Sequence, residues 1–247
     1  MRILLIDADV VAYKNSAKME RATEWEPGFW TWHCDEDAVK QAIDQEIETL
    51  VESLEADSFK LCLTDSDGNF RKDILPSYKS NRAGTKKPLV LKSIREWLIA
   101  ERDAYLKPTL EGDDVLGILS TWPGLRGEKV IVSIDKDMKT IPGLYYRDRE
   151  SGIVEITEEE ADYWHLYQTL TGDTTDGYAG CPGVGPKKAE AILTDDPSWG
   201  AVVAAYEKAG LSEADALQQA RVARILRASD YDFKKKEPRL WQPKPRR

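Results

Sequence analysis

Short apolar runs along the chain alternate with longer segments whose apolar residues recur every three or four positions. The runs at 3–6, 59–63 and 129–134 have the length of buried strands, whereas 35–54 and 112–122 have helical spacing. Because strands that alternate with helices pack into a parallel sheet, this part of the chain predicts an α/β fold.

The last third of the chain predicts helices only. A capping box at Thr157–Glu160 begins one helix, and Ser212 with Asp215 begins the last long one. We therefore expect an α/β core over 1–160 and a helical lobe over 161–247.

The composition excludes several classes of site. Three cysteines without a CxxC pair and only two histidines argue against a disulfide framework and against a Cys/His zinc site. The first apolar run is too short for a signal peptide or a membrane span, so we expect a cytoplasmic protein. A net charge of −9 is unusual for a DNA-binding protein, but basic residues are concentrated at 71–95 and 234–247. The composition therefore leaves DNA open as a partner.

Nine carboxylates stand at five separated points of the chain. Asp7, Asp65 and Asp135 each follow an apolar run, and the carboxyl ends of parallel strands share one edge of a sheet. The LEGDD segment opens a helix, so its acids can face the same edge. The full set is Asp7, Asp65, Glu111, Asp113, Asp114, Asp135, Asp137, Asp173 and Asp176.

So many ionised carboxylates repel one another unless a cation lies among them. Oxygen donors without His or Cys select Mg²⁺ or Mn²⁺. Two such ions, about 4 Å apart, would activate a water and stabilise the leaving oxygen of a phosphodiester. A single Asp after a strand is usually a turn or cap residue, so the prediction depends on the five points together.

A basic segment at about 70–100 has residues suited to nucleic acid. It begins just after the second acidic point, so we expect it at the rim of the site. Lys79 and Arg82 could reach a scissile phosphate, and Tyr78 could stack on an unpaired base. Lys86 and Lys87 would add attraction for the DNA backbone.

A glycine turn, GCPGVGPKKA, is the second candidate for nucleic-acid binding. Its glycines let the backbone approach a phosphate, and the following helix N-terminus offers free amides. Such turns between helices are mostly structural, but the position directly after GDTTDG favours a phosphate site. The residues concerned are Gly183, Val184, Gly185, Lys187 and Lys188.

These segments together resemble the flap endonuclease/5′→3′ exonuclease family, and phage-type exonucleases most of all. The matching motifs are LLIDAD, LTDSDGNFRKDILPSYKSNR, LEGDDVLGIL, VSIDKDMKTI and LTGDTTDGYAGCPGVGPKKAEAIL, in the family's order. The resemblance implies a PIN-like core and, within 173–193, a helix–three-turn–helix motif that binds duplex DNA, often through K⁺. It also implies Mg²⁺-dependent cleavage of DNA at a 5′ end, as an exonuclease or a flap endonuclease.

The resemblance assigns roles to individual residues. Tyr78, Lys79 and Arg82 match the family's helical arch, which clamps the 5′ strand and steers the scissile phosphate. The acids implied near one metal ion are Asp65, Asp113, Asp114 and Asp135, and those near the other are Asp137, Asp173 and Asp176. The implied catalytic set is Asp7, Asp65, Asp135, Lys79 and Arg82.

Three features depart from the family pattern. Lys79 and Glu111 are only 32 positions apart, which favours a lid or loop in place of a full arch. Residues 22–34 predict a Trp-rich β-hairpin around Pro27–Gly28, an insertion associated mainly with phage-type members. No sliding-clamp-binding peptide is visible at the C-terminus.

Two other functions stay open at this point. A PIN-type ribonuclease would share the acidic site, although the glycine turn is not expected there. A non-catalytic DNA-structure-binding protein would have no physical reason to keep nine mutually repelling acids. We expect a monomer that acts on DNA with a 5′ end, nick or flap, in the cytoplasm of a bacterium and encoded by it or by its phage.

Overall fold

The computed structural model describes residues 1–82 and 84–243, so part of the basic segment (83) and the end of the basic tail (244–247) lie outside the described residues. Its centre is a five-stranded sheet in the order β4-β1-β5-β6-β7. The strands are β1 (Arg2–Asp7), β4 (Ser58–Cys62), β5 (Glu128–Val132), β6 (Gly143–Tyr146) and β7 (Ile153–Ile156). Four strands are parallel, and β7 runs antiparallel to β6, so the predicted α/β sheet is confirmed but is mixed.

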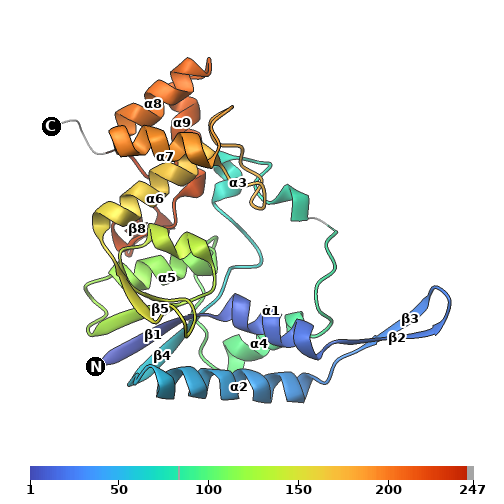
Figure 1. Ribbon diagram of the computed structural model, residues 1–247. Helices are drawn as coiled ribbons and strands as arrows, with labels where there is room; N and C mark the ends of the chain where they lie inside the picture. Colours follow the sequence, from blue (N-terminus) through green and yellow to red (C-terminus); the bar gives the residue numbers. More distant parts are fainter. Residues whose placement is uncertain (83, 244–247) are drawn as a thin grey trace.

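Helices cover both faces of the sheet (Figure 1). Successive side chains of β1 point to opposite faces, and both sets are buried. Leu4 and Ile6 pack with residues of α2 (Glu36–Ser53) and α4 (Leu91–Glu101). Ile3 and Leu5 pack on the other side with α5 (Gly112–Thr121). Strand β1, which lies between β4 and β5, therefore fixes the position of Asp7 at its end.

Helix α1 (Ala8–Met19) was not expected from the pattern of apolar residues. The residues that it buries are mostly small or polar, among them Ala12, Asn15 and Ser16, so the contrast between its faces is weak. Asp7 caps its first turn by accepting a hydrogen bond from the Val10 amide at 3.1 Å. The strand thus continues directly into a helix.

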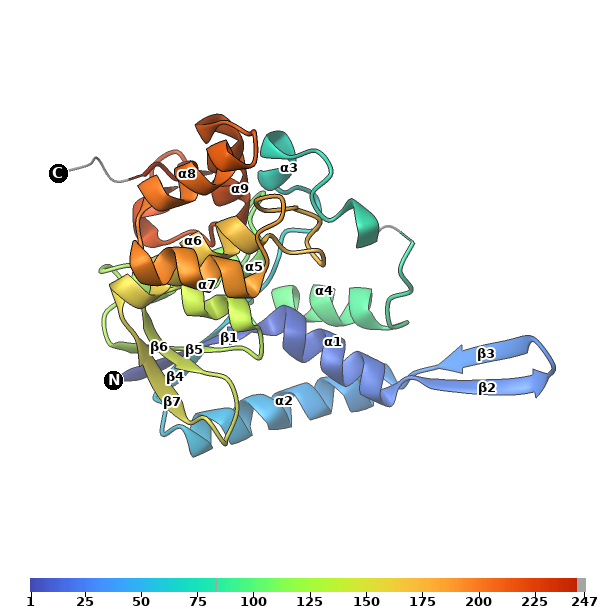
Figure 2. The same cartoon turned by 45° about the horizontal axis from the view of Figure 1, so that its top comes forward.

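The C-terminal part is helical, as predicted. It consists of α6 (Glu158–Thr171), α7 (Pro186–Asp195), α8 (Trp199–Lys208) and α9 (Glu213–Ala223), followed by the short pair β8 (Tyr231–Asp232) and β9 (Glu237–Pro238). Capping boxes at Thr157 and Ser212 begin α6 and α9. Figure 2 shows these helices beside α3 (Arg71–Ile74), which comes from the basic segment. Of the helices described, none is long and apolar enough to cross a membrane.

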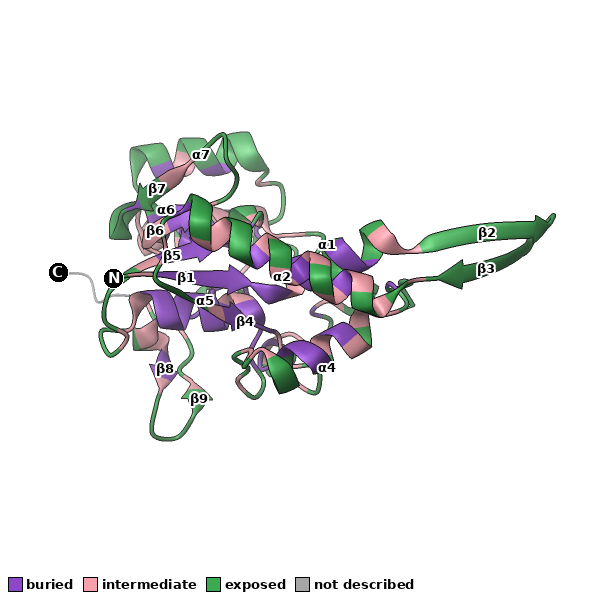
Figure 3. Ribbon diagram, turned by 90° about the horizontal axis from the view of Figure 1, so that it is seen from below, coloured by how far each residue is buried: buried purple, intermediate pink, exposed green. Residues whose placement is uncertain are grey.

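The predicted hairpin is present as β2 (Arg21–Glu26) and β3 (Phe29–His33). It joins α1 to α2 and extends away from the body of the protein, with every residue exposed (Figure 3). The turn contains Gly28 at φ 82°, a left-handed conformation that glycine adopts without strain.

His165 on α6 is part of the contact with α9. Its Nε2 lies 2.8 Å from the carbonyl oxygen of Ala220, and the side chain is buried. Burial, which disfavours the imidazolium, and then the nearby charge of Arg224 together lower the pKa of His165 to about 3. The folded protein therefore keeps this histidine neutral.

A buried neutral histidine predicts a loss of stability in mild acid. The unfolded chain protonates His165 below about pH 6.5 and the folded protein does not, so the free energy of unfolding should fall as the pH drops below that value. In the wild type, the contribution of His165 to the decrease in the free energy of unfolding approaches about 1.4 kcal/mol per pH unit. Urea unfolding between about pH 6.5 and pH 5 should show that His165→Gln lacks this contribution. His33→Gln, at the exposed second histidine, is the control and should behave like the wild type. Equal slopes for all three proteins would contradict the account.

Candidate active site

A cleft of about 360 Å³ lies where β1 and β5 end, beside the start of α5 and the loop that follows α6. Acids from four of the five predicted points converge there, because each comes from the end of a strand or from a loop at the same edge of the sheet. They are Asp7, Glu111, Asp113, Asp135, Asp137, Asp173 and Asp176.

The acids from β1 and α5 form one group within the cleft. Asp7 is 4% exposed and accepts a hydrogen bond from the Ser133 hydroxyl at 2.7 Å. Burial raises the pKa of Asp7. Burial also raises the pKa of Asp113, and the neighbouring charges of Asp7, Asp135 and Glu111 raise it further. These carboxylates therefore destabilise one another when ionised.

A second group lies around Asp137. Its pKa is raised to about 7 by burial first and then by the charges of Asp135, Asp173 and Asp176. The amide of Gln168 on α6 donates to Asp137 at 2.6 Å. Asp135 influences both groups, so the two are adjacent.

The basic residues Lys79 and Arg82 reach this cleft as predicted. The Lys79 ammonium lies 2.5 Å from Glu111 and 3.6 Å from Asp176, and Arg82 lies 2.5 Å from Asp176. Burial opposes ionisation of Glu111, but Arg71 and Lys79 outweigh it and lower its pKa. Two cations thus already compensate part of the acidic charge.

The loop between α6 and α7 is fastened to this basic segment. The Lys79 amide donates to the Asp176 carbonyl at 2.8 Å, and Asn81 donates to the Thr174 carbonyl at 2.9 Å. At the base of the loop, Gly172 and Gly180 lie backbone against backbone, and a Cβ on either one would collide with the opposite backbone. The glycines therefore let the loop close and hold Asp173 and Asp176 over the cleft.

Asp9 also lines the cleft, although only Asp7 of the LLIDAD motif was predicted as a site residue. It forms an ion pair with Arg95 and accepts the Thr64 amide at 2.7 Å. The signal was present in LLIDAD, where the second Asp stands in the first turn of α1.

Two of the nine predicted acids lie outside the cleft. Asp65 accepts the amides of Asp67 and Thr109 at 3.0 and 2.7 Å, so its oxygens shape a turn. Asp114 is fully buried and binds Arg71 through both oxygens, at 2.7 and 2.8 Å. The prediction that these two carboxylates face the metal ions therefore does not fit the structure. Thr109 lies 44 positions from Asp65 and Arg71 lies 43 positions from Asp114, so these contacts were not visible in the sequence.

Tyr78 also differs from its prediction. It is 2% exposed, so it has no free face for stacking on a base. Its hydroxyl lies 3.0 Å from carboxylate oxygens of both Glu111 and Asp176. Tyr78 instead helps to hold these two acids in position through its hydroxyl.

The remaining predicted DNA-binding residues lie on the surface. Lys86 pairs with Glu20 at 2.6 Å, and Lys87 is exposed. Lys188 donates to the Gly183 carbonyl at 2.8 Å and thereby holds the glycine turn, while Lys187 is exposed. The turn, which includes Gly183, Val184 and Gly185, precedes Pro186 at the start of α7, as predicted. A Cβ on Gly183 or Gly185 would meet open space, so this backbone is free to approach a ligand.

The donor chemistry of the cleft fits a hard divalent cation, since its eight carboxylates, Asp9 included, supply only oxygen. Within residues 1–82 and 84–243, no three His, Cys, Asp or Glu side chains already converge as a metal cage. Ion pairs with Lys79 and Arg82 occupy oxygens of Glu111 and Asp176, and mutual repulsion opposes a closer approach of the ionised acids. Binding of a cation would therefore require these side chains to reorient.

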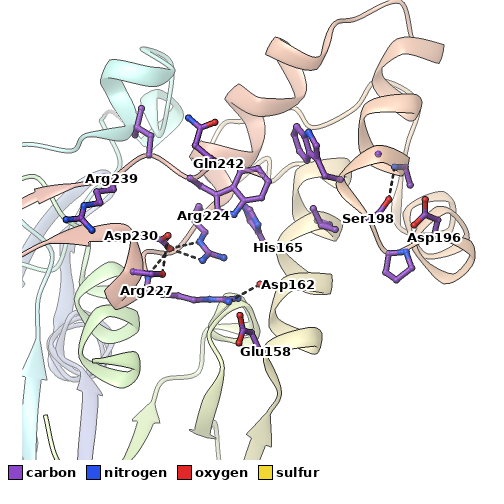
Figure 4. Close-up of a pocket in the computed structure, with 18 of the residues that line it drawn as sticks. Glu158, Asp162, His165, Asp196, Ser198, Arg224, Arg227, Asp230, Arg239 and Gln242 are labelled. Atoms are coloured by element: carbon purple, nitrogen blue, oxygen red, sulfur yellow. Dashed lines mark hydrogen bonds and ion pairs between the residues drawn. The ribbon is translucent and has the colours of Figure 1, made fainter. Parts of the chain in front are cut away.

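A larger cavity, of about 970 Å³, lies between α6, the start of α8 and the chain near Trp241 (Figure 4). Each of its three arginines has a carboxylate partner: Arg224 lies 2.8 Å from Asp230, Arg227 2.8 Å from Asp162, and Arg239 2.9 Å from Asp232. These ion pairs hold the C-terminal segment in place. The cavity contains none of the acids that converge in the cleft, so it is not a rival for the chemistry.

The corrected role of Asp114 can be tested by unfolding. Removing one partner of a buried ion pair leaves an uncompensated charge, so Asp114→Ala should lower the free energy of unfolding by about 3–5 kcal/mol. Asp44→Ala breaks the more exposed pair with Arg102 and should cost less than about 1 kcal/mol. Urea unfolding near neutral pH measures both. A small, equal loss in the two variants would show that Asp114 has no structural role of this kind.

Comparisons with known proteins give a consistent result. The family model described as 5′-3′ exonuclease, N-terminal resolvase-like domain, matches residues 2–160. The exodeoxyribonuclease of Enterobacteria phage T3 is 34% identical over a 283-residue alignment that covers 98% of this chain and 93% of the relative. The exonuclease of Escherichia phage T7 is 34% identical over 282 residues, with the same coverage.

The fold also resembles a solved structure. The crystal structure of the bacteriophage T5 D15 flap endonuclease, a pseudo-enzyme-product complex with DNA and metal ions, matches with a TM-score of 0.68. The match has 14% identity and covers 91% of this chain and 89% of that one. At this level of identity the likeness concerns the fold alone.

Proposed function

The chain belongs to the 5′-3′ exonuclease family, and we propose that its acidic cleft hydrolyses DNA phosphodiesters near 5′ ends with two divalent cations. The observation that carries this proposal is the convergence of seven predicted carboxylates from four separated points of the sequence. Such a cluster is costly without cations, and its donors suit Mg²⁺, with Mn²⁺ as a substitute. The metal ions in the T5 complex support the same chemistry.

The two electrostatic groups suggest how the acids divide. In this proposal one ion is held by acids of the first group, and the other by acids of the second. The first comprises Asp7, Glu111, Asp113 and Asp135, and the second comprises Asp137, Asp173 and Asp176. Bound there, the two cations would supply Lewis-acid activation of the attacking water and neutralise charge on the leaving oxygen.

Lys79 and Arg82 would orient the scissile phosphate. Both already lie at the cleft, and a phosphate oxygen offers them an anionic partner comparable to the carboxylates of Glu111 and Asp176. The planar Arg82 guanidinium can bind a phosphate through two parallel hydrogen bonds. Because the segment around Lys79 is short and fastened to the loop at Asp176, we propose that it acts as a lid.

The duplex part of the substrate would bind beside the C-terminal helices. We propose that α6, the glycine turn and α7 form the family's helix–three-turn–helix motif, with K⁺ at the turn and Lys187 near a phosphate. The core is proposed to be PIN-like. The family match ends at residue 160, which supports a division there into a nuclease core and a helical lobe.

The named relatives are phage proteins, and we propose a phage-encoded monomer that acts on DNA in the bacterial cytoplasm. A PIN-type ribonuclease is the second candidate function. The name of the phage T3 relative, exodeoxyribonuclease, favours DNA. Parallel assays on matched DNA and RNA duplexes therefore belong in the test.

The proposal predicts both the direction of cleavage and the residue that it needs. With Mg²⁺, labelled duplex, nicked and flap DNA should lose a 5′ label in short products while a 3′ label stays on long ones. Asp135→Ala should slow cleavage more than about a hundredfold, because Asp135 belongs to the first acidic group and its charge also acts on Asp137 of the second. The variant should still bind DNA within a few-fold of wild type.

Asp67→Ala is the matched control, since Asp67 is an exposed acid outside the cleft. It should cleave at the wild-type rate. Wild-type turnover in Asp135→Ala would refute the metal assignment, and initial release of the 3′ label would refute the polarity.

A further inference from the structure

The β2–β3 hairpin extends away from the body of the protein (Figures 1 and 3) and carries four large, exposed aromatic side chains. Trp25 is 66% exposed, Phe29 58%, Trp30 49% and Trp32 46%. A two-stranded ribbon without a packing partner is marginally stable in water, and clustered exposed aromatic residues mark a binding surface. The hairpin therefore has the character of an arm that meets a ligand.

The strand register divides these residues between two faces. Trp32 pairs with Ala22 and Trp30 with Glu24, so both indoles stand on one face, which we call the Trp30/Trp32 face. Trp25 belongs to the opposite face, where its indole nitrogen donates to the Thr31 hydroxyl at 2.8 Å. The two faces can thus be tested separately.

The base of the hairpin is joined to the basic segment that leaves the cleft. Glu20 accepts the Lys86 ammonium at 2.6 Å and the Leu89 amide at 2.7 Å. The same Lys86 ammonium lies over the Trp32 ring. Seven positions separate Lys79 in the cleft from Lys86, a span of about 25 Å at most. Basic residues thus stand at both ends of this short segment, with Lys79 and Arg82 at the cleft and Lys86 at the Trp30/Trp32 face.

We propose that the Trp30/Trp32 face binds unpaired DNA that extends from the cleft. Bases would stack on the two indoles, which stand about 7 Å apart along the strand, and Lys86 would contact a phosphate. This inference rests on the proposed function. Single-stranded DNA fits better than a protein partner because the face lies beside a lysine whose segment begins at Lys79 and Arg82 in the cleft.

The acidic residues of the hairpin limit how this contact works. Glu20 is compensated by Lys86, which lowers the pKa of this carboxyl, but Glu24 stands beside Trp30 on the same face. The Glu24 carboxylate also accepts the Gly28 amide at 3.2 Å and so helps to close the turn. Binding near the tip must therefore depend on stacking rather than on neutralising phosphates.

The test compares affinity for a blunt duplex with affinity for the same duplex carrying a 5′ single-stranded tail of about 12 nucleotides. Fluorescence anisotropy is measured in the Asp135→Ala background, so that binding is read without cleavage. The affinity for the tailed duplex divided by the affinity for the blunt duplex is the ratio of interest. It should fall about tenfold or more in Trp30→Ala/Trp32→Ala. Trp30→Phe/Trp32→Phe keeps aromatic rings and should retain most of the ratio. Trp25→Ala, on the opposite face, should leave it unchanged.

An unchanged ratio in Trp30→Ala/Trp32→Ala would overturn the proposal and would point to a protein partner for the hairpin. An equal loss in Trp25→Ala would also overturn it, because a general loss of hairpin structure would then explain both results. Hydrolysis is measured separately with otherwise wild-type protein. A fall in the ratio without hydrolysis of any DNA would support the hairpin site while refuting the proposed nuclease activity.

Discussion

Mutual repulsion among carboxylates is the constraint on which the rest of this structure depends. Asp7 and Asp113 are drawn together by the ends of β1 and the start of α5, and the pKa of each is raised. The surrounding chain offsets part of this cost through Lys79 and Arg82 and through hydrogen bonds from Ser133 and Gln168. A cluster that remains unfavourable after such compensation is suited to binding cations.

Holding the acids close together requires that distant segments be tied to one another. The basic segment is held at the cleft in part by the hydrogen bond from the Lys79 amide to the Asp176 carbonyl. Arg71, in the same segment, binds Asp114 on α5. It also donates to the carbonyl of Val222, near the end of α9, and to that of Arg224, just after this helix. Core, basic segment and C-terminal helices are therefore positioned by one buried network, and a change in any of them would move the acids.

The sequence predicted the convergence of the acids because a strand end is a local property. Asp7 and Asp135 follow apolar runs, and the sheet then brings them to one edge. The sequence could not predict that Asp113 faces the cleft while Asp114 points into the core. Adjacent residues of one helix point to different sides, and the partner of Asp114, Arg71, lies 43 positions away. The burial of Tyr78 was hidden for the same reason. Helix α1 and the β6–β7 pair were missed because their apolar patterns are short or weak.

The family-level prediction is confirmed by the match to residues 2–160 and by the phage relatives. Asp113 lines the acidic cleft and Asp65 does not, so the proposed set of cation-binding acids includes Asp113 and leaves out Asp65. Calorimetric titration of Mn²⁺ tests this most directly. The account predicts that the wild type and Asp65→Asn bind two ions each, whereas Asp113→Asn loses at least one or binds it far more weakly. Wild-type binding by Asp113→Asn, or loss of an ion in Asp65→Asn, would contradict it.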